Sequence, residues 1–286
     1  MTRLAEWLAG GPLISDGAWG TQLQARGLAP GESPDTWNLT HPDRVEAVAR
    51  AYVEAGSQVI LTNTFRANGI AMDGDLDAIN RAGVAISRRA AEGRALVFAS
   101  MGPTGKMLLT AEVTPAQVFA AFDAQAAALA GAGADALLVE TLSDPDEARI
   151  AVHAAKRTGL PVIGSFAFDS GRRKDRTMMG ATPEAVAAAM VEAGADGVGA
   201  NCGVGAEFAA AICGRLRAAC QLPVWIKPNA GLPVLVEGEI CYDVSPNLFA
   251  SHYAALCAAG AGFVGACCGS SPDFIRALVT ARCASN

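Results

Sequence analysis

The sequence predicts a single (β/α)8 barrel, the TIM-barrel class of α/β fold. Short apolar runs alternate eight times with longer alanine-rich stretches of helical spacing, and no linker interrupts the alternation. With 286 residues, of which 51% are apolar and 17% charged, the chain can bury one large core. We therefore expect one domain that spans residues 1–286.

The predicted strands are apolar or β-branched segments that each precede a helical stretch. In chain order they are LISD (13–16), QVILT (58–62), ALVFAS (95–100), DALLVE (135–140), PVIGSFAF (161–168), DGVGAN (196–201), PVWIKP (223–228) and GFVGACC (262–268). A doubly wound open sheet is the main alternative. It is weakened because the first turn, DGAWGTQL at 16–23, is not a G-x-G-x-x-G phosphate cradle, and the chain has no P-loop.

Three of the helices between these strands have clear start signals. Thr40 or Asp43 is the expected cap of the helix in 41–56, and Thr-Pro pairs at Thr114 and Thr182 open the next two. Four helices end in Ala-Gly-Ala or Ala-Gly-Ser just before a strand. These endings predict glycine caps that lead into buried parallel strands.

Composition narrows the function classes. A formal net charge of −6 argues against nucleic-acid or anionic-membrane binding, which needs a basic patch. The N-terminal stretch is too weak for a secretory signal and no apolar run reaches membrane-spanning length, so we expect a cytoplasmic protein. Eight cysteines in a reducing compartment favour metal binding or burial over disulfides.

In a barrel of this class, functional residues lie at the carboxyl ends of the strands. The polar residues at these ends are Asp16-Gly17, Asn63-Thr64, Glu140-Thr141, Asn201-Cys202-Gly203, Lys227-Pro228-Asn229 and Cys267-Cys268-Gly269. They are expected to converge on one face. Lys227 closes its strand as a charge, but no motif supports a catalytic role for it.

Three cysteines belong to this set, and the other five are predicted to be small buried hydrophobes. Of those five, Cys241 falls in a loop and the rest in helical stretches: Cys213, Cys220, Cys257 and Cys283. Three thiols at one barrel mouth suit a catalytic zinc site with an open fourth position, although three buried or redox-active thiols fit as well. Adjacent strand residues point to opposite faces, so Cys267 and Cys268 can share an ion only if the chain leaves strand geometry, which Gly265 and Gly269 permit.

Six segments together resemble the homocysteine-binding domain family, the zinc-dependent homocysteine S-methyltransferases. They are DGAWGTQL (16–23), LTNTF (61–65), ETLSD (140–144), GANC (199–202), PNAGLP (228–233) and GACCGSSPDFI (265–275). The resemblance implies a (β/α)8 barrel with one Zn²⁺ held by Cys202, Cys267 and Cys268. It further implies that Asp16 and Glu140 bind the ammonium group of homocysteine.

Gly17, Asn63 and Thr64 are carried over as further substrate-binding residues. Ala266 replaces the second glycine that the family usually shows, a minor departure. Within the family the chain looks most like the N-terminal module of cobalamin-dependent methionine synthase, although Leu61 stands where that module usually carries a glutamate. Any role of that carboxylate is therefore in doubt here.

The resemblance implies methyl transfer to homocysteine to form methionine, with no catalytic side chain beyond the zinc-bound substrate thiolate. Zinc deprotonates a bound thiol, and three further thiolates preserve its nucleophilicity. Our first hypothesis is a methyl group supplied by methylcobalamin on a separate corrinoid protein. The alternatives are betaine, S-methylmethionine or another onium donor, bound by aromatic residues such as Trp19 and Trp37, or a non-catalytic zinc-binding or redox-sensing barrel.

Overall fold

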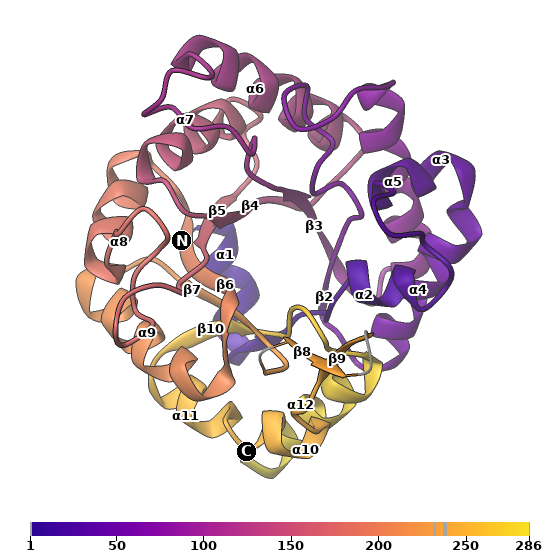
Figure 1. Cartoon of the computed structure of the whole chain (residues 1–286). Coiled ribbons are helices and arrows are strands. Elements are labelled where there is room, and N and C mark those ends of the chain that lie inside the picture. The colour runs from indigo at the N-terminus through magenta and orange to yellow at the C-terminus, as the bar shows by residue number, and fades with distance from the viewer. Residues whose placement is uncertain (1, 232, 237–238, 286) are drawn as a thin grey trace.

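The computed structural model describes residues 2–231, 233–236 and 239–285, and eight parallel strands form its barrel (Figure 1). The barrel strands are β1 (Leu13–Ile14), β2 (Val59–Leu61), β3 (Leu96–Met101), β4 (Ala136–Leu142), β5 (Val162–Phe166), β6 (Gly197–Gly205), β7 (Val224–Asn229) and β10 (Ala261–Val264). All eight predicted strand segments are present, so the predicted fold class is confirmed.

The strands are hydrogen-bonded in the order β1-β10-β7-β6-β5-β4-β3-β2. The barrel closes between β1 and β2, where Ser15 forms a parallel bridge with Val59 and the Gln58 N–H donates to the Ile14 carbonyl at 2.8 Å. This nearly closed sheet leaves only short unpaired edges.

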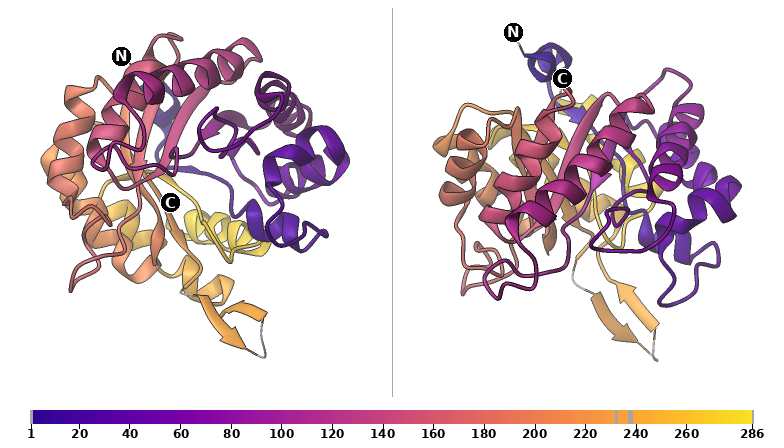
Figure 2. Two further views of the ribbon diagram at one scale, coloured as in Figure 1. Left: turned by 45° about the horizontal axis from the view of Figure 1, so that its top comes forward. Right: turned by 90° about the horizontal axis from the view of Figure 1, so that it is seen from above.

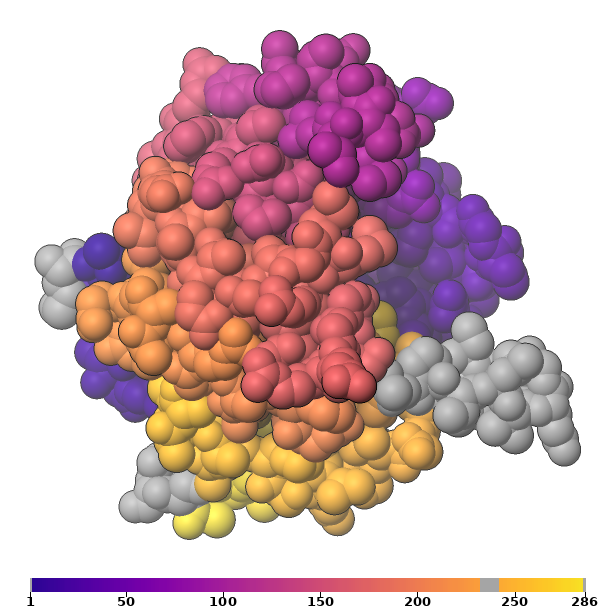
Figure 3. Space-filling model, turned by 60° about the vertical axis from the view of Figure 1, so that its left-hand side comes forward, coloured from indigo at the N-terminus to yellow at the C-terminus, as the bar shows by residue number. Residues whose placement is uncertain are grey.

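Helices cover the outside of the barrel (Figure 1), and α8 and α9 pack against each other and against β6. In the space-filling view, residues of these two segments form neighbouring parts of one face (Figure 3). The helices are α1 (Arg3–Trp7), α2 (Gly20–Gln24), α3 (Trp37–Thr40), α4 (Pro42–Glu54), α5 (Leu76–Ala91), α6 (Pro115–Gly131), α7 (Pro145–Lys156), α8 (Pro183–Glu192), α9 (Ala206–Ala219), α10 (Pro246–Ala250), α11 (Tyr253–Ala258) and α12 (Pro272–Ser285), with 3-10 turns η1 (Leu8–Gly10) and η2 (Pro34–Thr36).

Two of the three predicted helix caps are confirmed. The hydroxyls of Thr114 and Thr182 accept the backbone N–H three residues on, and Thr114 completes a capping box with Gln117. The cap predicted for α4 is wrong, because His41 occupies the N-cap position and its side chain makes no capping bond to the helix. The Thr40 hydroxyl instead donates to the Thr36 carbonyl at the end of α3. The predicted glycine caps are confirmed, since all four of these glycines have positive φ angles: Gly56, Gly133, Gly194 and Gly260.

Two apolar cores lie on either side of the sheet. The outer core packs the strands against the helices, and the smaller inner core fills the barrel with residues such as Phe98, Leu138 and Trp225. Leu4 of α1 is fully buried in the inner core, and the Trp7 ring lies 5.4 Å from that of Phe98. The N-terminal helix therefore closes the end of the barrel at which the strands begin.

The opposite end carries an antiparallel hairpin of β8 (Pro233–Val236) and β9 (Glu239–Tyr242), inserted between β7 and α10 (Figure 2). Cys241 is predicted in a loop but lies in β9 instead, so that prediction is wrong; its side chain is outside the described part of the chain. Within the described residues, no helix is long and apolar enough to cross a membrane.

Candidate active site

The upper layer of the barrel interior is polar. Strand side chains alternate between the two faces of the sheet, so Ser100, Glu140 and Lys227 share the inward face with Phe98, Leu138 and Trp225, which stand two residues earlier. Ser100, Glu140 and Lys227 lie at or near the carboxyl ends of their strands, and all three line one cavity. A period-two pattern thus places two opposite charges inside the barrel mouth.

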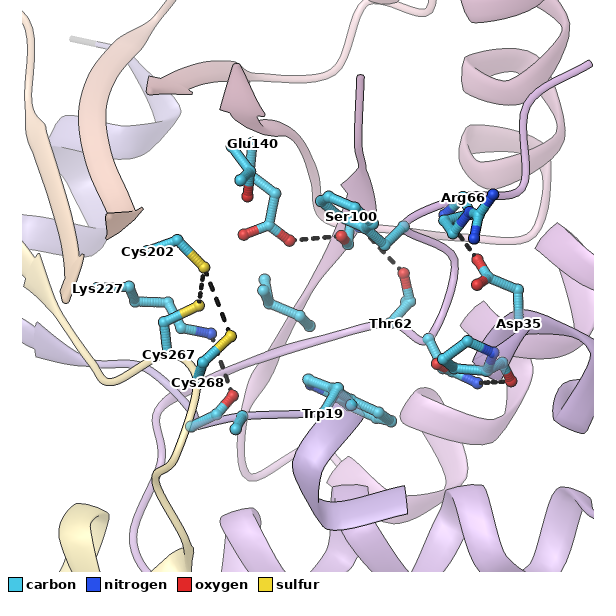
Figure 4. A pocket seen from close by; sticks show the side chains of 18 residues that line it. Trp19, Asp35, Thr62, Arg66, Ser100, Glu140, Cys202, Lys227, Cys267 and Cys268 are labelled. Atoms are coloured by element: carbon cyan, nitrogen blue, oxygen red, sulfur yellow. Dashed lines mark hydrogen bonds between the residues drawn. The ribbon is translucent and has the colours of Figure 1, made fainter. Parts of the chain in front are cut away.

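The cavity has a volume of about 370 Å³ and lies at the carboxyl ends of the strands. Figure 4 shows the side chains that line it. Its wall is formed by Gly17, Ala18, Trp19, Gly20, Pro34, Asp35, Leu61, Thr62, Asn63, Phe65, Arg66, Ser100, Glu140, Thr141, Cys202, Lys227, Cys267 and Cys268. The three predicted cysteines therefore lie together in the wall of a space large enough for a small molecule.

Cys202 reaches this cavity through an irregular backbone. In a regular strand it would face outward with Val198 and Ala200, which belong to the outer core. Instead Cys202 has a φ of 56° and Gly203 a φ of 64°, and the pairing of β6 with β7 shifts register between Cys202 and Gly205. A left-handed non-glycine residue costs about 1–3 kcal/mol, and such strain concentrates at functional sites.

Cys267 and Cys268 reach the same point because the eighth barrel strand ends early. The sequence predicted a strand through residue 268, but β10 ends at Val264. The Cys267 N–H still donates to the Pro228 carbonyl at 2.8 Å, and the Cys268 carbonyl accepts from the Ala230 N–H at 2.9 Å. Outside regular strand geometry, both thiols can turn toward Cys202.

The three thiols form one compact cluster. The Cys202 Sγ lies 2.8 Å from that of Cys267 and 3.7 Å from that of Cys268, and all three sulfurs lie within 4.8 Å of one another. Sulfurs at two corners of a tetrahedron around zinc, with Zn–S bonds of about 2.3 Å, stand about 3.8 Å apart. Cys202 and Cys268 match that spacing, and Cys267 needs to move outward by about 1 Å.

The protonation of the cluster also suits a cation. Hydrogen bonds from Cys202 and Cys267 lower the pKa of the Cys268 thiol. The pKa of the Cys202 thiol is raised well above its usual range by its contacts with Cys267 and Cys268 and by burial. Three thiolates cannot all form here without a positive charge between them. The donor set and its spacing therefore fit a thiolate-binding metal ion.

Glu140 is the carboxylate that faces the cavity. Its Oε1 accepts from the Ser100 hydroxyl at 2.5 Å, and its Oε2 accepts from the Asn201 amide at 3.2 Å. Burial raises its pKa to about 7, although Lys227 acts in the opposite direction. The Asn201 Oδ1 also accepts from the Thr141 N–H at 2.9 Å, and its Nδ2 donates to the Thr141 hydroxyl at 2.7 Å. Asn201, which directly precedes Cys202, is thereby held against the end of β4.

Asp16 lies behind the cavity wall and is fully buried. Its Oδ1 accepts from the Lys227 ammonium at 2.6 Å, and its Oδ2 accepts from the Leu61 N–H and the Trp19 indole N–H, both at 2.8 Å. Burial lowers the pKa of Lys227, but the negative charges of neighbouring groups, with Asp16 first, raise it by more. The net pKa is therefore above its usual value. Lys227 thus keeps its ammonium form beside Asp16.

Of the remaining predicted substrate-binding residues, two line the cavity and one does not. Gly17 and Asn63 line the cavity. A Cβ on Gly17 would come within 2.7 Å of Tyr52 and Ser270, so only glycine fits there. The Asn63 amide donates to the Pro34 and Asn38 oxygens. Thr64 is fully buried outside the cavity wall, and its hydroxyl donates to the Ser100 carbonyl at 2.7 Å.

No sequence pattern predicted the far wall of the cavity, where Asp35 lies opposite the cysteines (Figure 4). Asp35 is in η2, its Oδ1 accepts from the Arg66 N–H at 2.8 Å, and burial raises its pKa to about 6. A buried carboxylate in a loop has no periodic signal that could reveal it. The predicted Trp37 lies outside the cavity, bonded to Glu32.

The cysteines outside the cluster differ in burial. Cys213 and Cys220 are buried, as predicted, and Cys257 is half-buried. Cys283 is exposed near the end of α12, so its predicted burial is wrong; the last turn of that helix extends past the core.

A sequence model described as homocysteine S-methyltransferase matches residues 13–282 of the chain. The chain belongs to this family. The resemblance seen in the sequence and the predicted methyltransferase class are thereby confirmed at the level of the family. Membership extends over every barrel strand and all three cysteines of the cluster.

Two methionine synthases are among the curated relatives of this chain. That of Mycobacterium leprae is 33% identical over 306 aligned residues, and that of Mycobacterium tuberculosis is 32% identical over 302. The alignments cover 99% and 98% of this chain but 25% of each relative. The chain thus spans about a quarter of the length of these proteins.

Among solved structures, the homocysteine methyltransferase MmuM of Escherichia coli is similar over nearly its whole length. Its metallated form superposes with a TM-score of 0.81 at 24% identity, covering 98% of this chain and 99% of that one. Its apo form gives a TM-score of 0.75 at 26% identity over 94% and 95% of the two chains. The barrel architecture is therefore shared with this family member.

Proposed function

We propose that this barrel is a zinc-dependent homocysteine S-methyltransferase that forms methionine. The observation that carries the proposal is the convergence of Cys202, Cys267 and Cys268 on one wall of a cavity that also holds Glu140. Family membership supports the reaction class, and the names of the relatives support methionine as the product. The cytoplasmic location and the single-domain extent over residues 1–286 remain predictions.

The three cysteine thiolates would hold the zinc ion. When bound, zinc supplies a Lewis acid that keeps the substrate thiol deprotonated near neutral pH. The backbone itself brings these ligands together, because the left-handed Cys202 and the early end of β10 place the three sulfurs within 4.8 Å of one another. A preformed site lowers the cost of ordering the ligands.

The other cavity residues bind and orient the acceptor. The Glu140 oxygens each hold one hydrogen-bond donor, from Ser100 and Asn201, and each keeps lone pairs for the ammonium group of an amino acid. The predicted ammonium contact of Asp16 stays a prediction, as do the substrate contacts of Gly17, Asn63 and Thr64. No side chain needs to act as a general acid or base, since the leaving group departs without a proton.

We propose methylcobalamin on a separate corrinoid protein as the methyl donor. The support is the similarity to methionine synthases, of which this chain spans about a quarter. A small onium donor is the second candidate, because Trp19 and Phe65 both line the cavity and cationic methyl groups bind aromatic faces.

A methyl-donor screen tests the proposal. Zinc-loaded protein is mixed with homocysteine and with methylcobalamin, a methylated corrinoid protein, betaine or S-methylmethionine, and methionine is quantified. We expect methionine with the corrinoid donors and none from a Cys268→Ser variant. Equal turnover with a small onium donor would refute the corrinoid part of the proposal, and no methionine with any donor would refute the whole.

A further inference from the structure

A second cavity lies between α5 and α6, in the outer layer of the barrel. Its volume of about 540 Å³ is larger than that of the active-site cavity and typical of a small-molecule site. Its wall is formed by residues of the two helices and of the loops that precede them: Ala67, Asn68, Gly69, Ile70, Leu76, Asp77, Asn80, Val113, Gln117, Ala120, Ala121, Ala124, Gln125 and Ala128. No described residue lines both cavities, so this second space is separate from the proposed reaction.

The buried part of this wall is uncharged. It consists of alanine and valine side chains and of three carboxamides, Asn68, Asn80 and Gln125. Asp77 is the one charged residue in the described wall, and it is exposed and paired with Arg81 at 2.7 Å. An uncharged ligand is therefore favoured, because burying a charge without a partner is costly. The buried wall holds no nucleophile and no titratable group among the described residues, so it can bind a ligand but cannot react with it.

Two of the three carboxamides have a polar group to spare. The Asn68 Oδ1 accepts from the Ile70 and Ala71 N–H groups at 3.1 and 2.9 Å, but its Nδ2 has no partner among the described residues. The Gln125 Nε2 donates to the Thr64 carbonyl at 2.8 Å, whereas its Oε1 has no partner in that part of the chain either. Both side chains are at most 2% exposed, and polar groups buried this deeply are normally hydrogen-bonded.

The other bonds of these side chains fix which group is spare. Asn68 must present its oxygen to two backbone N–H groups, and Gln125 must present its nitrogen to a backbone carbonyl. The Gln125 nitrogen also donates to the Asn80 Oδ1 at 3.4 Å, while the Asn80 Nδ2 donates to two backbone carbonyls at 2.8 Å. Turning either amide around would set donor against donor or acceptor against acceptor. The spare groups are therefore one donor, on Asn68, and one acceptor, on Gln125.

The second cavity adjoins the active site through the segment that follows β2. Phe65 and Arg66 line the active-site cavity, and the next four residues, 67–70, line the second one. Gln125 contacts the start of the same segment, through the Thr64 carbonyl. A ligand held between the two spare amide groups therefore contacts the segment that carries Phe65 and Arg66 into the active site.

We propose that the cavity between α5 and α6 is a binding site for an uncharged amide. The carbonyl of the ligand accepts from the Asn68 Nδ2, its N–H donates to the Gln125 Oε1, and its apolar body packs against the alanine and valine side chains of the wall. Both spare groups then gain a partner, and no charge is buried. The site goes beyond the proposed methyl transfer, and a bound ligand acts on the active site through the segment 65–70.

Benzamide, acetophenone and benzoate test the inference, because the three have nearly the same shape and only benzamide offers an uncharged carbonyl beside an N–H. Each is titrated into ¹⁵N-labelled, metal-free protein, and dissociation constants are taken from the NMR signals of the side-chain amides of Asn68 and Gln125. We expect benzamide to bind about tenfold or more tightly than the other two, since both lack the N–H donor. Equal affinities for benzamide and acetophenone would show that water satisfies the two spare groups equally well and would overturn the inference.

Three variants locate the bound benzamide. Asn68→Asp keeps the oxygen that accepts from the backbone and replaces the spare donor by an acceptor, so it should weaken binding about tenfold or more. Ala124→Trp fills the cavity from its exposed edge and should abolish binding. The matched control is Ala127→Trp, which lies exposed on α6 outside the cavity and should leave the dissociation constant unchanged.

The remaining outcomes are equally decisive. Benzamide that binds Ala124→Trp as tightly as the parent protein occupies another site, and the inference fails. The backbone signals of Phe65 and Arg66 should shift on binding to the parent, and signals that stay in place would overturn the link to the active site. Should Asn68→Asp not fold, Ala124→Trp still decides. Because no zinc or turnover is involved, failure of the methyl-donor screen leaves this inference standing.

Discussion

Replacing Glu140 by Gln should change the pH dependence of stability in a defined direction. Burial raises the pKa of Glu140 from 4.5 to about 7. In unfolded chains the group titrates near 4.5, so the folded state holds the proton more tightly. Below pH 4.5 both states are protonated and no stability is lost. As the pH rises from 4.5 to 7, the folded state is progressively destabilised by the cost of ionising a buried carboxylate.

The size of the effect follows from the pKa values. The rise from 4.5 to about 7 corresponds, at about 1.4 kcal/mol for each pH unit, to about 3 kcal/mol. Glutamine has nearly the same shape and no charge, so Glu140→Gln should match the parent protein at pH 4.5 and exceed its free energy of unfolding by up to about 3 kcal/mol above pH 7. For a chain of this length that difference is about 5 °C in melting temperature.

The assay is thermal or urea unfolding of metal-free protein, with a reductant present, between pH 4.5 and 8.5. Glu184→Gln is a control of opposite sign: Arg215 lowers the pKa of Glu184 to about 2, so this variant should be less stable than the parent at neutral pH and approach it as the pH falls. A stability difference for Glu140→Gln that stays constant from pH 5 to 8 would refute the reasoning.

Three further predictions concern the metal, the polar network and the barrel wall. Cys202→Ser should reduce bound zinc from about one ion per chain to nearly none by atomic absorption, whereas Cys213→Ser, buried outside the cluster, should retain it. Asn201→Ala removes the partners of the Thr141 N–H and the Ser165 hydroxyl, at about 1–3 kcal/mol each, and should lower the melting temperature by several degrees; exposed Asn247→Ala should not. Gly265→Ala brings a Cβ against Ser15 and the Asp16 backbone and should cost about 1–3 kcal/mol or more in urea unfolding, while Gly214→Ala in α9, with open space around it, should be neutral or stabilising.

Local sequence patterns were sufficient for the scaffold. Eight apolar runs with helical stretches between them specify strands and helices, and the glycines after four of the helices specify where the chain turns back into the sheet. Strand alternation also predicts that Glu140 and Lys227 point into the barrel, because each stands two residues after an apolar residue of the inner core.

The sequence by itself determined the barrel, the set of three cysteines and the family to which they point. Only the tertiary structure decided how the site is assembled. The left-handed turn at Cys202 depends on the register shift between β6 and β7, and the pairing of Asp16 with Lys227 joins residues 211 positions apart across Gly265. Such contacts depend on which strands become neighbours when the barrel closes. A local pattern fixes the direction of a side chain, but not the partner that meets it.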